Sequence, residues 1–253
     1  MSLYTNKHIV ITGGTKGIGK ACVELMCREG GKVSILDIDT NIQSEYGPAV
    51  AFYKTDVSKA VQVQNTITKA IAAFGDIDVL VNNAGIVKYA TVTEATEEEW
   101  DLILNVNLKS AFLCAKYCIP SMVKKGKGVV INVASVQAFI SQQKVAAYTT
   151  SKSALLGLTR SIAVDYAPHI RCVAVCPGTV DTPMLREAIK QSPDPDEVYQ
   201  ECIDMHLLKK LATPEEVAEL ISFLASDKAS FITGQAYRID GGLGISVGGS
   251  KRD

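Results

Sequence analysis

Short apolar, β-branched segments alternate with helical segments along almost the whole chain of 253 residues. These apolar segments lack a polar face, which is typical of strands that are buried on both sides of a parallel sheet. The helices between them supply the crossover connections that parallel strands require. We therefore expect an α/β fold built on a doubly wound, seven-stranded parallel sheet flanked by helices. The expected strands are residues 7–12, 32–36, 50–55, 79–81, 128–133, 171–175 and 235–239.

Helical segments with capping signals fill the spaces between these strands. Ser58 is expected to cap the second helix, and Thr213, Pro214 and Glu216 form a capping box that opens the last one. The helices are expected at residues 17–29, 58–74, 96–122, 146–166 and from 213 onward.

The sequence shows no boundary between domains. No Gly/Ser-rich or Pro-rich linker, internal repeat or low-complexity tract divides it, so residues 1–253 are expected to form a single domain. Residues 179–210 form a long irregular stretch that is interrupted by prolines. Long excursions from a compact α/β core often cover a site, so we expect a substrate lid at 179–210 and a C-terminal tail at 243–253.

The composition excludes several classes of protein. The net charge is −1, from 26 basic and 27 acidic side chains, whereas nucleic-acid-binding proteins normally carry a basic excess. The longest apolar runs, such as residues 128–133, are far shorter than the roughly 20 residues of a membrane span. The N-terminus lacks the charged and then apolar order of a signal peptide. We therefore expect a cytoplasmic protein without a nucleic-acid or membrane partner.

The cysteines and histidines give no sign of a metal site. The seven cysteines lie mostly in apolar stretches, so they are expected to be reduced, buried thiols. They form no CxxC pair and no pair of histidines lies nearby, so no metal is expected. The three histidines match no motif and are expected to be structural or surface residues, although His206 lies in the stretch 179–210.

A glycine-rich turn joins the first expected strand to the first expected helix. Its spacing, from Thr12 to Gly19, is GxxxGxG instead of GxGxxG. Glycines let the backbone approach a pyrophosphate, and a helix N-terminus attracts an anion. Ligands of open α/β sheets bind beyond the carboxyl ends of the strands, so a dinucleotide is expected here. The residues of the turn expected to hold it are Gly13, Thr15, Lys16, Gly17, Ile18 and Gly19.

Two residues with opposite charges bear on which dinucleotide is bound. Asp37 ends the second strand, where a carboxylate accepts hydrogen bonds from ribose hydroxyls and repels a 2′-phosphate. Lys16 acts in the opposite sense, because its ammonium could pair with that phosphate. We expect the carboxylate to dominate, which favours NAD over NADP. Further cofactor contacts are expected from residues at the ends of the next strands, which are Asp56, Val57, Asn83, Ala84 and Gly85.

Tyr148 and Lys152 lie one turn apart on the expected helix 146–166. Residues i and i+4 share a helix face, so both can meet one ligand. A phenol titrates near pH ~10 in water, and a neighbouring ammonium favours the phenolate. Tyr148 is therefore a candidate general base that takes a proton from an alcohol. Ser135, at the end of the fifth strand, is expected to orient and polarise the substrate oxygen, and Lys152 to hold a ribose.

Together these motifs resemble the short-chain dehydrogenase/reductase family, and the resemblance extends from about residue 6 to residue 242. The features that carry it are the Thr12–Gly19 turn, the Asn82–Gly85 run, Asn107, Ser135, Tyr148, Lys152, Pro177, Gly178 and Ile239–Gly242. The resemblance implies a Rossmann-type fold and hydride transfer between a CH–OH group and the nicotinamide of NAD(P). It implies that the catalytic residues are Asn107, Ser135, Tyr148 and Lys152.

The resemblance also implies roles that the residues alone do not show. Asn107 would bend its helix and hold a water that relays protons from Lys152. The segment after the sixth strand would contact the nicotinamide through Pro177, Gly178, Val180 and Thr182. Helices 96–122 and 146–166 would pair across a two-fold axis and give a homotetramer, although burial against the sheet alone also explains their apolar stripes. Those stripes contain Leu102, Val106, Ala111, Phe112, Ala154, Leu155, Leu158 and Ile162.

The substrate is expected to be a small polyhydroxylated molecule. Within the family, the segments around Ser135, Tyr148 and Pro177 resemble archaeal aldohexose dehydrogenases, which oxidise the anomeric hydroxyl of a sugar to a lactone. The polar residues Lys88, Gln137 and Lys144 near the site fit such a substrate. A 3-hydroxy acid or 3-oxoacyl substrate is the alternative, since cations near the site could pair with a carboxylate. A non-catalytic NAD-binding sensor is the alternative from another class.

Overall fold

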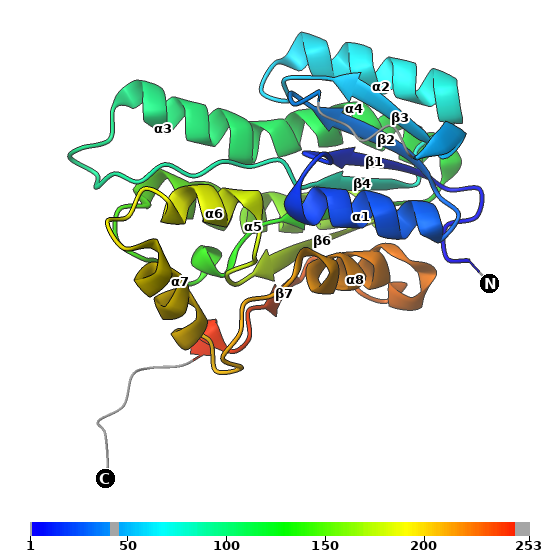
Figure 1. Cartoon of the computed structure of the whole chain (residues 1–253). Coiled ribbons are helices and arrows are strands. Elements are labelled where there is room, and N and C mark those ends of the chain that lie inside the picture. The colour runs from blue at the N-terminus through cyan, green and yellow to red at the C-terminus, as the bar shows by residue number, and fades with distance from the viewer. Residues whose placement is uncertain (1, 41–45, 246–253) are drawn as a thin grey trace.

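The computed structural model describes residues 2–40 and 46–245 and shows the expected parallel sheet (Figure 1). Within the described residues the sheet has seven strands in the order β3-β2-β1-β4-β5-β6-β7, and each neighbouring pair is parallel. All seven expected strands are confirmed, with ends shifted by a few residues. The strands are β1 (His8–Thr12), β2 (Lys32–Asp37), β3 (Val50–Lys54), β4 (Val79–Asn82), β5 (Gly128–Val133), β6 (Ile170–Pro177) and β7 (Ala236–Ile239).

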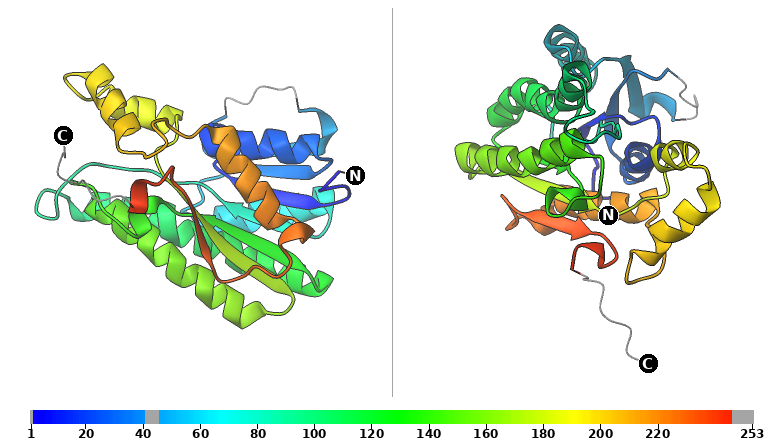
Figure 2. Two further views of the ribbon diagram at one scale, coloured as in Figure 1. Left: turned by 90° about the horizontal axis from the view of Figure 1, so that it is seen from below. Right: turned by 90° about the vertical axis from the view of Figure 1, so that its left-hand side faces the viewer.

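Helices cover both faces of the sheet, and each face has its own apolar core (Figure 2). On one face α1 (Gly17–Arg28) and α8 (Pro214–Ala225) pack over alternate side chains of the strands. On the other face α2 (Ala60–Phe74), α4 (Ser110–Lys125) and α5 (Ala146–Tyr166) bury the remaining side chains. Because both faces are buried, the strands are apolar throughout, as the sequence indicated.

The winding of the chain places the candidate site. From β1 the sheet grows through β2 to β3 in one direction, and then restarts with β4 on the other side of β1. In open α/β sheets such a reversal leaves a crevice at the carboxyl ends of the two central strands, where ligands bind. The glycine turn after β1 and the Asn82–Gly85 run after β4 both lie at this reversal.

The region expected to be a lid contains two helices, α6 (Pro183–Ile189) and α7 (Pro195–Asp204). Figure 1 shows them beyond the end of the sheet at which β6 finishes. A single β-bridge between Val180 and Ala212 closes the base of the excursion. Of the expected C-terminal tail, residues 246–253 lie outside the described residues.

One expectation about helices was wrong. Ser58 does not cap α2, which begins at Ala60, since Lys59 occupies the N-cap position; the Ser58 N–H and hydroxyl both donate to the Asp56 carboxylate. The expected helix 96–122 is confirmed as a continuous helical stretch, which consists of α3 (Glu97–Leu104), a π-helical segment (Asn105–Lys109) and α4, which ends at Lys125. The capping box at Thr213 is confirmed.

The long helical stretch Glu97–Lys125 is also strongly apolar. By length and composition alone it could cross a membrane, with 29 residues and an 18-residue window of mean hydropathy 1.3. Half of its most apolar window is buried inside the fold. Such burial is typical of a helix in a protein core, since α4 packs against α2 and the sheet.

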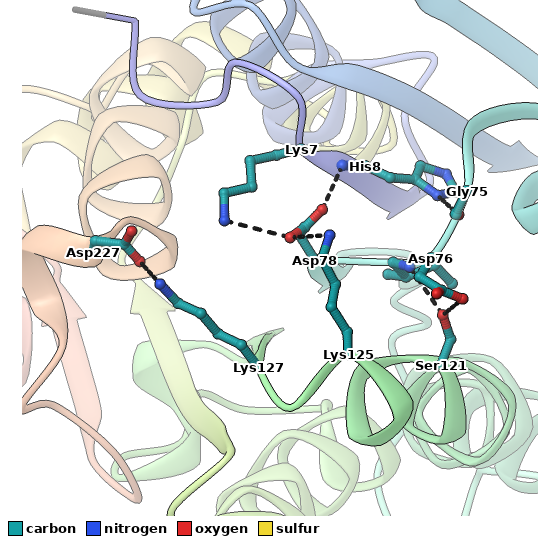
Figure 3. Close-up of polar contacts among 10 residues, drawn as sticks. Lys7, His8, Gly75, Asp76, Asp78, Ser121, Lys125, Lys127 and Asp227 are labelled. Atoms are coloured by element: carbon teal, nitrogen blue, oxygen red, sulfur yellow. Dashed lines mark hydrogen bonds and ion pairs between the residues drawn. The ribbon is translucent and has the colours of Figure 1, made fainter.

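A cluster of charged residues lies at the amino ends of β1 and β4 (Figure 3). The Asp78 carboxylate is 5% exposed and accepts a hydrogen bond from the His8 N–H at 2.9 Å. Lys125 and Lys7 point toward the same carboxylate at 2.7 and 3.4 Å. These partners satisfy a charge that burial alone would disfavour, so the cluster has a structural role.

All seven cysteines are free thiols, and five of them are buried. Burial raises the pKa of Cys22 and Cys114 to about 12, so these thiols are protonated and unreactive at neutral pH. Among residues 2–40 and 46–245, no group of three or more His, Cys, Asp or Glu side chains is placed to hold a metal ion.

Candidate active site

The glycine turn between β1 and α1 leaves no room for side chains at its glycine positions. A Cβ on Gly19 would lie 2.0 Å from the Gly13 carbonyl oxygen. Gly17 has a left-handed φ of +51°, and a Cβ there would lie 3.1 Å from Cγ2 of Thr182. The N-cap residue of α1, Lys16, makes no capping hydrogen bond with its side chain. The turn therefore presents backbone and a helix N-terminus to the crevice, which fits the diphosphate of a dinucleotide.

Asn83 braces this turn from the next strand. Its side-chain amide donates to the carbonyl oxygens of Thr12 at 3.0 Å and Gly13 at 2.9 Å. The backbone N–H groups of Asn83 and Ala84 both donate to the Thr12 hydroxyl at 3.0 Å. The Asn83 amide therefore holds the backbone of the glycine turn in place.

Asp37 is held in one orientation at the end of β2. Its Oδ2 accepts hydrogen bonds from the Thr15 hydroxyl at 2.7 Å and the Thr15 N–H at 3.1 Å. Its Oδ1 accepts from the Asp39 N–H at 3.0 Å. Asp39 in turn forms an ion pair with Lys16, so the Lys16 ammonium lies beside a second carboxylate. The sequence pattern gave no role to Asp39, because only the folded turn brings it to Lys16.

Asp56 and Val57, which lie in the loop after β3, are placed differently from one another. The Asp56 carboxylate accepts from Ser58, and the Asp56 N–H donates to Gln62 at 2.8 Å. The Val57 side chain is buried in the core between α2 and the sheet. Only backbone atoms of Val57 can therefore contact a cofactor.

Tyr148 and Lys152 lie side by side in the first turns of α5. The Lys152 Nζ atom is 5.6 Å from the centre of the Tyr148 ring and donates to the Val133 carbonyl at 2.9 Å. Lys152 is 4% exposed, and this burial lowers its pKa to about 8. Burial raises the pKa of the Tyr148 phenol, and a hydrogen bond with the Ser135 side chain opposes that shift.

Ser135 is oriented by the turn that follows β5. Its Oγ accepts a hydrogen bond from the Gln137 N–H at 3.1 Å, because Ser135 caps the short 3-10 helix Val136–Ala138. With one lone pair engaged in this way, the Ser135 hydroxyl is left to donate its proton. It can therefore donate toward Tyr148 or toward a substrate oxygen.

Asn107 lies inside the π-helical segment, as the resemblance implied for a local bend. Its Oδ1 accepts from the Ile86 N–H at 2.8 Å, while its Nδ2 donates to the Ile86 carbonyl at 2.9 Å and to the Ser151 hydroxyl at 3.0 Å. A Cβ on Gly85 would lie 3.3 Å from Lys152 Nζ and 3.4 Å from Asn107 Oδ1. The structure therefore brings Asn107, Gly85 and Lys152 together.

The segment Pro177–Thr182 follows β6 and faces the glycine turn. Val180 is buried and forms the bridge to Ala212. The Thr182 hydroxyl accepts from the Leu185 N–H at 3.4 Å and caps α6, so its own proton remains available to an acceptor. The contact between Thr182 and Gly17 places this segment across the crevice from the diphosphate cradle.

The residues expected to face the substrate are already engaged with other groups. Lys88 pairs with Glu99 at 3.1 Å, and the Gln137 side chain accepts from the Thr149 hydroxyl at 3.3 Å. Lys144 is exposed, and its carbonyl accepts from the Ala90 N–H at 2.7 Å. This last bond brings the loop after Asn82–Gly85 against the loop before α5.

The same bond places Tyr89, which no motif indicated, at the mouth of the site. Its hydroxyl is hydrogen-bonded to Gln142, and its ring lies within electrostatic range of Tyr148 and Cys202. His206, expected to be structural or superficial, is buried beside the Pro177–Thr182 segment. No sequence signal could have found either residue, because their neighbours are distant in the chain.

Comparison with known proteins agrees with this geometry. The family model described as Enoyl-(Acyl carrier protein) reductase matches residues 13–244. Dehydrogenase/reductase SDR family member 6 of Danio rerio is 39% identical over 247 residues, covering 96% of this chain and 99% of the relative. The chain belongs to the short-chain dehydrogenase/reductase family. It is therefore an oxidoreductase that acts on CH–OH groups of small molecules and uses NAD(P).

Other members of the family differ in what they oxidise. The 2-(S)-hydroxypropyl-CoM dehydrogenase 3 of Xanthobacter autotrophicus is 36% identical over 246 residues, covering 94% of this chain and 96% of the relative. The ligand-free aldohexose dehydrogenase of Thermoplasma acidophilum superposes with a TM-score of 0.93 at 38% identity, covering 99% of this chain and 98% of that structure. The family thus defines the reaction class of this enzyme and leaves its substrate open.

Proposed function

We propose that the enzyme is an NAD-dependent aldose dehydrogenase that oxidises the anomeric hydroxyl of a sugar to a lactone. The observation that carries this proposal is that each cation expected near the substrate, Lys88, Lys144 and Arg186, lies beside a carboxylate. Lys88 is paired with Glu99, and Arg186 makes a bidentate pair with Asp181 at 2.8 and 2.9 Å. The likeness to an aldohexose dehydrogenase over nearly the whole chain also supports it.

The other polar side chains near the site are neutral. Lys144 lies within electrostatic range of Glu94, so the third cation near the site is also opposed by a carboxylate. Gln137 and Gln142 carry amides, and Tyr89 carries a phenol. Amides and phenols both donate and accept, which matches the hydroxyls of an uncharged sugar better than a carboxylate.

In this proposal the catalytic residues act on one substrate oxygen. Ser135 donates a hydrogen bond to that oxygen and fixes its position, and Tyr148 removes its proton as general base. The Lys152 ammonium stabilises the phenolate and binds the nicotinamide ribose, while Asn107 holds a water that relays the released proton away from Lys152. NAD, when bound, supplies the hydride acceptor. Asp37 and the glycine turn hold its adenosine ribose and diphosphate.

A substrate panel tests the proposal. We expect turnover of one or more aldoses with NAD and little turnover of 3-hydroxybutyrate, because a carboxylate would find each nearby cation already paired. The measurement is the rate of NADH formation across aldoses and 3-hydroxy acids, together with detection of the lactone. Reaction of the acid alone would favour the 3-hydroxy acid or 3-oxoacyl alternative. Binding of NADH without turnover of any alcohol would favour the sensor.

The preference for NAD is proposed from the charges around the adenosine ribose. Asp37 would repel a 2′-phosphate, and the ion pair with Asp39 draws the Lys16 ammonium away from such a phosphate. We expect Asp37→Ser with Asp39→Asn to shift the ratio of kcat/KM for NADP over NAD by on the order of 10²-fold, because both repulsion and competition are removed.

Single variants separate the two contributions. Asp39→Asn alone frees Lys16 but leaves the Asp37 carboxylate, so it is expected to change the ratio by less than about tenfold. The measurement is kcat/KM with each cofactor for wild type, the double variant and Asp39→Asn. A wild-type enzyme that prefers NADP would contradict the proposal.

We also propose that the enzyme is a cytoplasmic homotetramer. Of the apolar stripes on α4 and α5, Ala111, Leu155 and Ile162 are buried within one chain. Phe112 is 48% exposed, and Leu102 of α3 is 43% exposed. Exposed large apolar side chains on adjacent helices favour pairing with another copy. The mass in solution by gel filtration with light scattering tests this, and a monomer would refute it.

A further inference from the structure

His206 lies just beyond α7, at the end of the lid, and its side chain is only 2% exposed. Three segments that are far apart in the chain surround it. They are the last turn of α7, the Pro177–Thr182 segment after β6, and the loop after β7. A buried imidazole that contacts all three can link the lid to the cofactor side of the site.

The hydrogen bonds of His206 define its tautomer. The Thr179 N–H donates to Nε2 at 3.1 Å, and an N–H can bond only to an unprotonated ring nitrogen. The proton of the neutral imidazole therefore lies on Nδ1, which donates to the Cys202 carbonyl at 2.7 Å. One tautomer thus satisfies a donor on one segment and an acceptor on another.

Two glycines make room for this ring and keep it in place. A Cβ on Gly178 would lie 2.8 Å from Nε2, and one on Gly241 would lie 3.3 Å from Cδ2. The Leu208 N–H donates to the Gly241 carbonyl at 3.2 Å, which holds the loop after β7 against the same turn. Because backbone encloses the ring closely, it cannot turn away without breaking its bond to Thr179.

The backbone that His206 holds leads directly to the candidate cofactor contacts. Thr179 precedes Val180, and the segment ends at Thr182, which contacts Gly17 of the glycine turn. A shift of Thr179 would therefore move the residues that lie across the crevice from the diphosphate cradle. The adenosine side, formed by Asp37 and Thr15, is not connected to His206 by any of these bonds.

We propose that His206 is a positioning residue that fixes the Pro177–Thr182 segment against the nicotinamide half of the cofactor and couples that segment to the lid helix α7. The inference rests on the proposed placement of the nicotinamide against this segment. Loss of the Nε2 acceptor leaves the Thr179 N–H without its partner, so the segment loses its fixed position. Binding of the adenosine half of the cofactor does not depend on this bond and is expected to stay unchanged when it is lost.

Matched substitutions test which ring nitrogen matters. His206→Gln keeps an acceptor at the place of Nε2, whereas His206→Asn keeps a donor at the place of Nδ1 and loses that acceptor. We expect His206→Asn to weaken NADH binding about tenfold, as the loss of a buried hydrogen bond predicts. His206→Gln is expected to stay within about threefold of wild type. The affinity for ADP-ribose, which lacks the nicotinamide, is expected to be unchanged in both.

The measurements are dissociation constants for NADH and ADP-ribose by calorimetry on the full-length protein. His169→Asn is the control, because His169 is exposed at the amino end of β6 and contacts none of these segments. Equal loss of both ligands in His206→Asn, or unchanged NADH binding, would overturn the role of His206. A wild-type protein that binds NADH no better than ADP-ribose would overturn the nicotinamide placement itself, whatever the variants do.

Discussion

Tyr148→Phe is expected to lower kcat by about 10²–10⁴-fold while NADH still binds, because it removes the general base and leaves the ring in place. The Tyr148 ring lies 5.6 Å from Lys152 Nζ, and its phenol is hydrogen-bonded to Ser135. Phenylalanine keeps the packing of the ring against Lys152 and loses only the hydroxyl. Binding and turnover should therefore separate.

The measurements are steady-state kinetics with the best substrate of the panel and NADH affinity by fluorescence. Tyr117→Phe, on α4 and away from the crevice, is the matched control and should leave both values unchanged. Turnover of Tyr148→Phe at the wild-type rate would remove Tyr148 from the mechanism. Loss of NADH affinity by the same factor as kcat would instead indicate that the hydroxyl acts mainly in binding.

The sheet could be predicted from the sequence because burial on both faces requires strands that are apolar throughout. Strands such as β5 and β6 consist almost wholly of apolar residues, and glycines or prolines mark their ends. Competition between neighbouring groups for hydrogen bonds produces no such pattern in the sequence. Ser58 has the residue type of a helix cap, but Asp56 is close enough to take both of its donors. A residue type alone does not show whether a serine will cap a helix or bond to a neighbouring side chain.

The placement of the candidate catalytic residues was predictable because spacing along one helix and position at strand ends fix it. Tyr148 and Lys152 share a face of α5, and Ser135 follows β5. The π-helical segment around Asn107 was not predictable from helical pattern, since the bonds that accompany it run to Ile86 and Ser151. Both partners belong to other elements, and only the folded chain brings them together.

Residues that act through tertiary contacts left no signal at all. Asp39 meets Lys16 only after β2 and the glycine turn are formed. His206 acquires a defined tautomer only when Thr179 and Cys202 lie on either side of it. The sequence therefore indicated the reaction class and the opposing charges of Asp37 and Lys16, whereas the contacts of Asp39 and His206 became visible only in the structure.

Lys152→Met is expected to lower kcat by about 10²–10⁴-fold, since the phenolate loses its neighbouring charge, and yet to stabilise the fold at pH 7. Burial lowers the pKa of Lys152 from 10.5 to about 8, so the folded protein at pH 7 carries a buried ammonium at a cost. A shift of this size corresponds to about 3 kcal/mol. The lost bond to the Val133 carbonyl offsets about 1 kcal/mol, which leaves a net gain of about 2 kcal/mol.

The pH dependence distinguishes this cause from a change in packing. Between pH 8 and 10.5 the unfolded chain binds more protons at Lys152 than the folded chain does, so the free energy of unfolding of the wild type rises with pH in this window. The advantage of Lys152→Met should therefore be largest below pH 8 and fade as the pH approaches 10.5. Urea unfolding of both proteins at pH 7 and pH 10 measures it, with exposed Lys69→Met as the control. An advantage that is equal at both pH values would mean that methionine packs better, and that the buried charge costs the fold nothing.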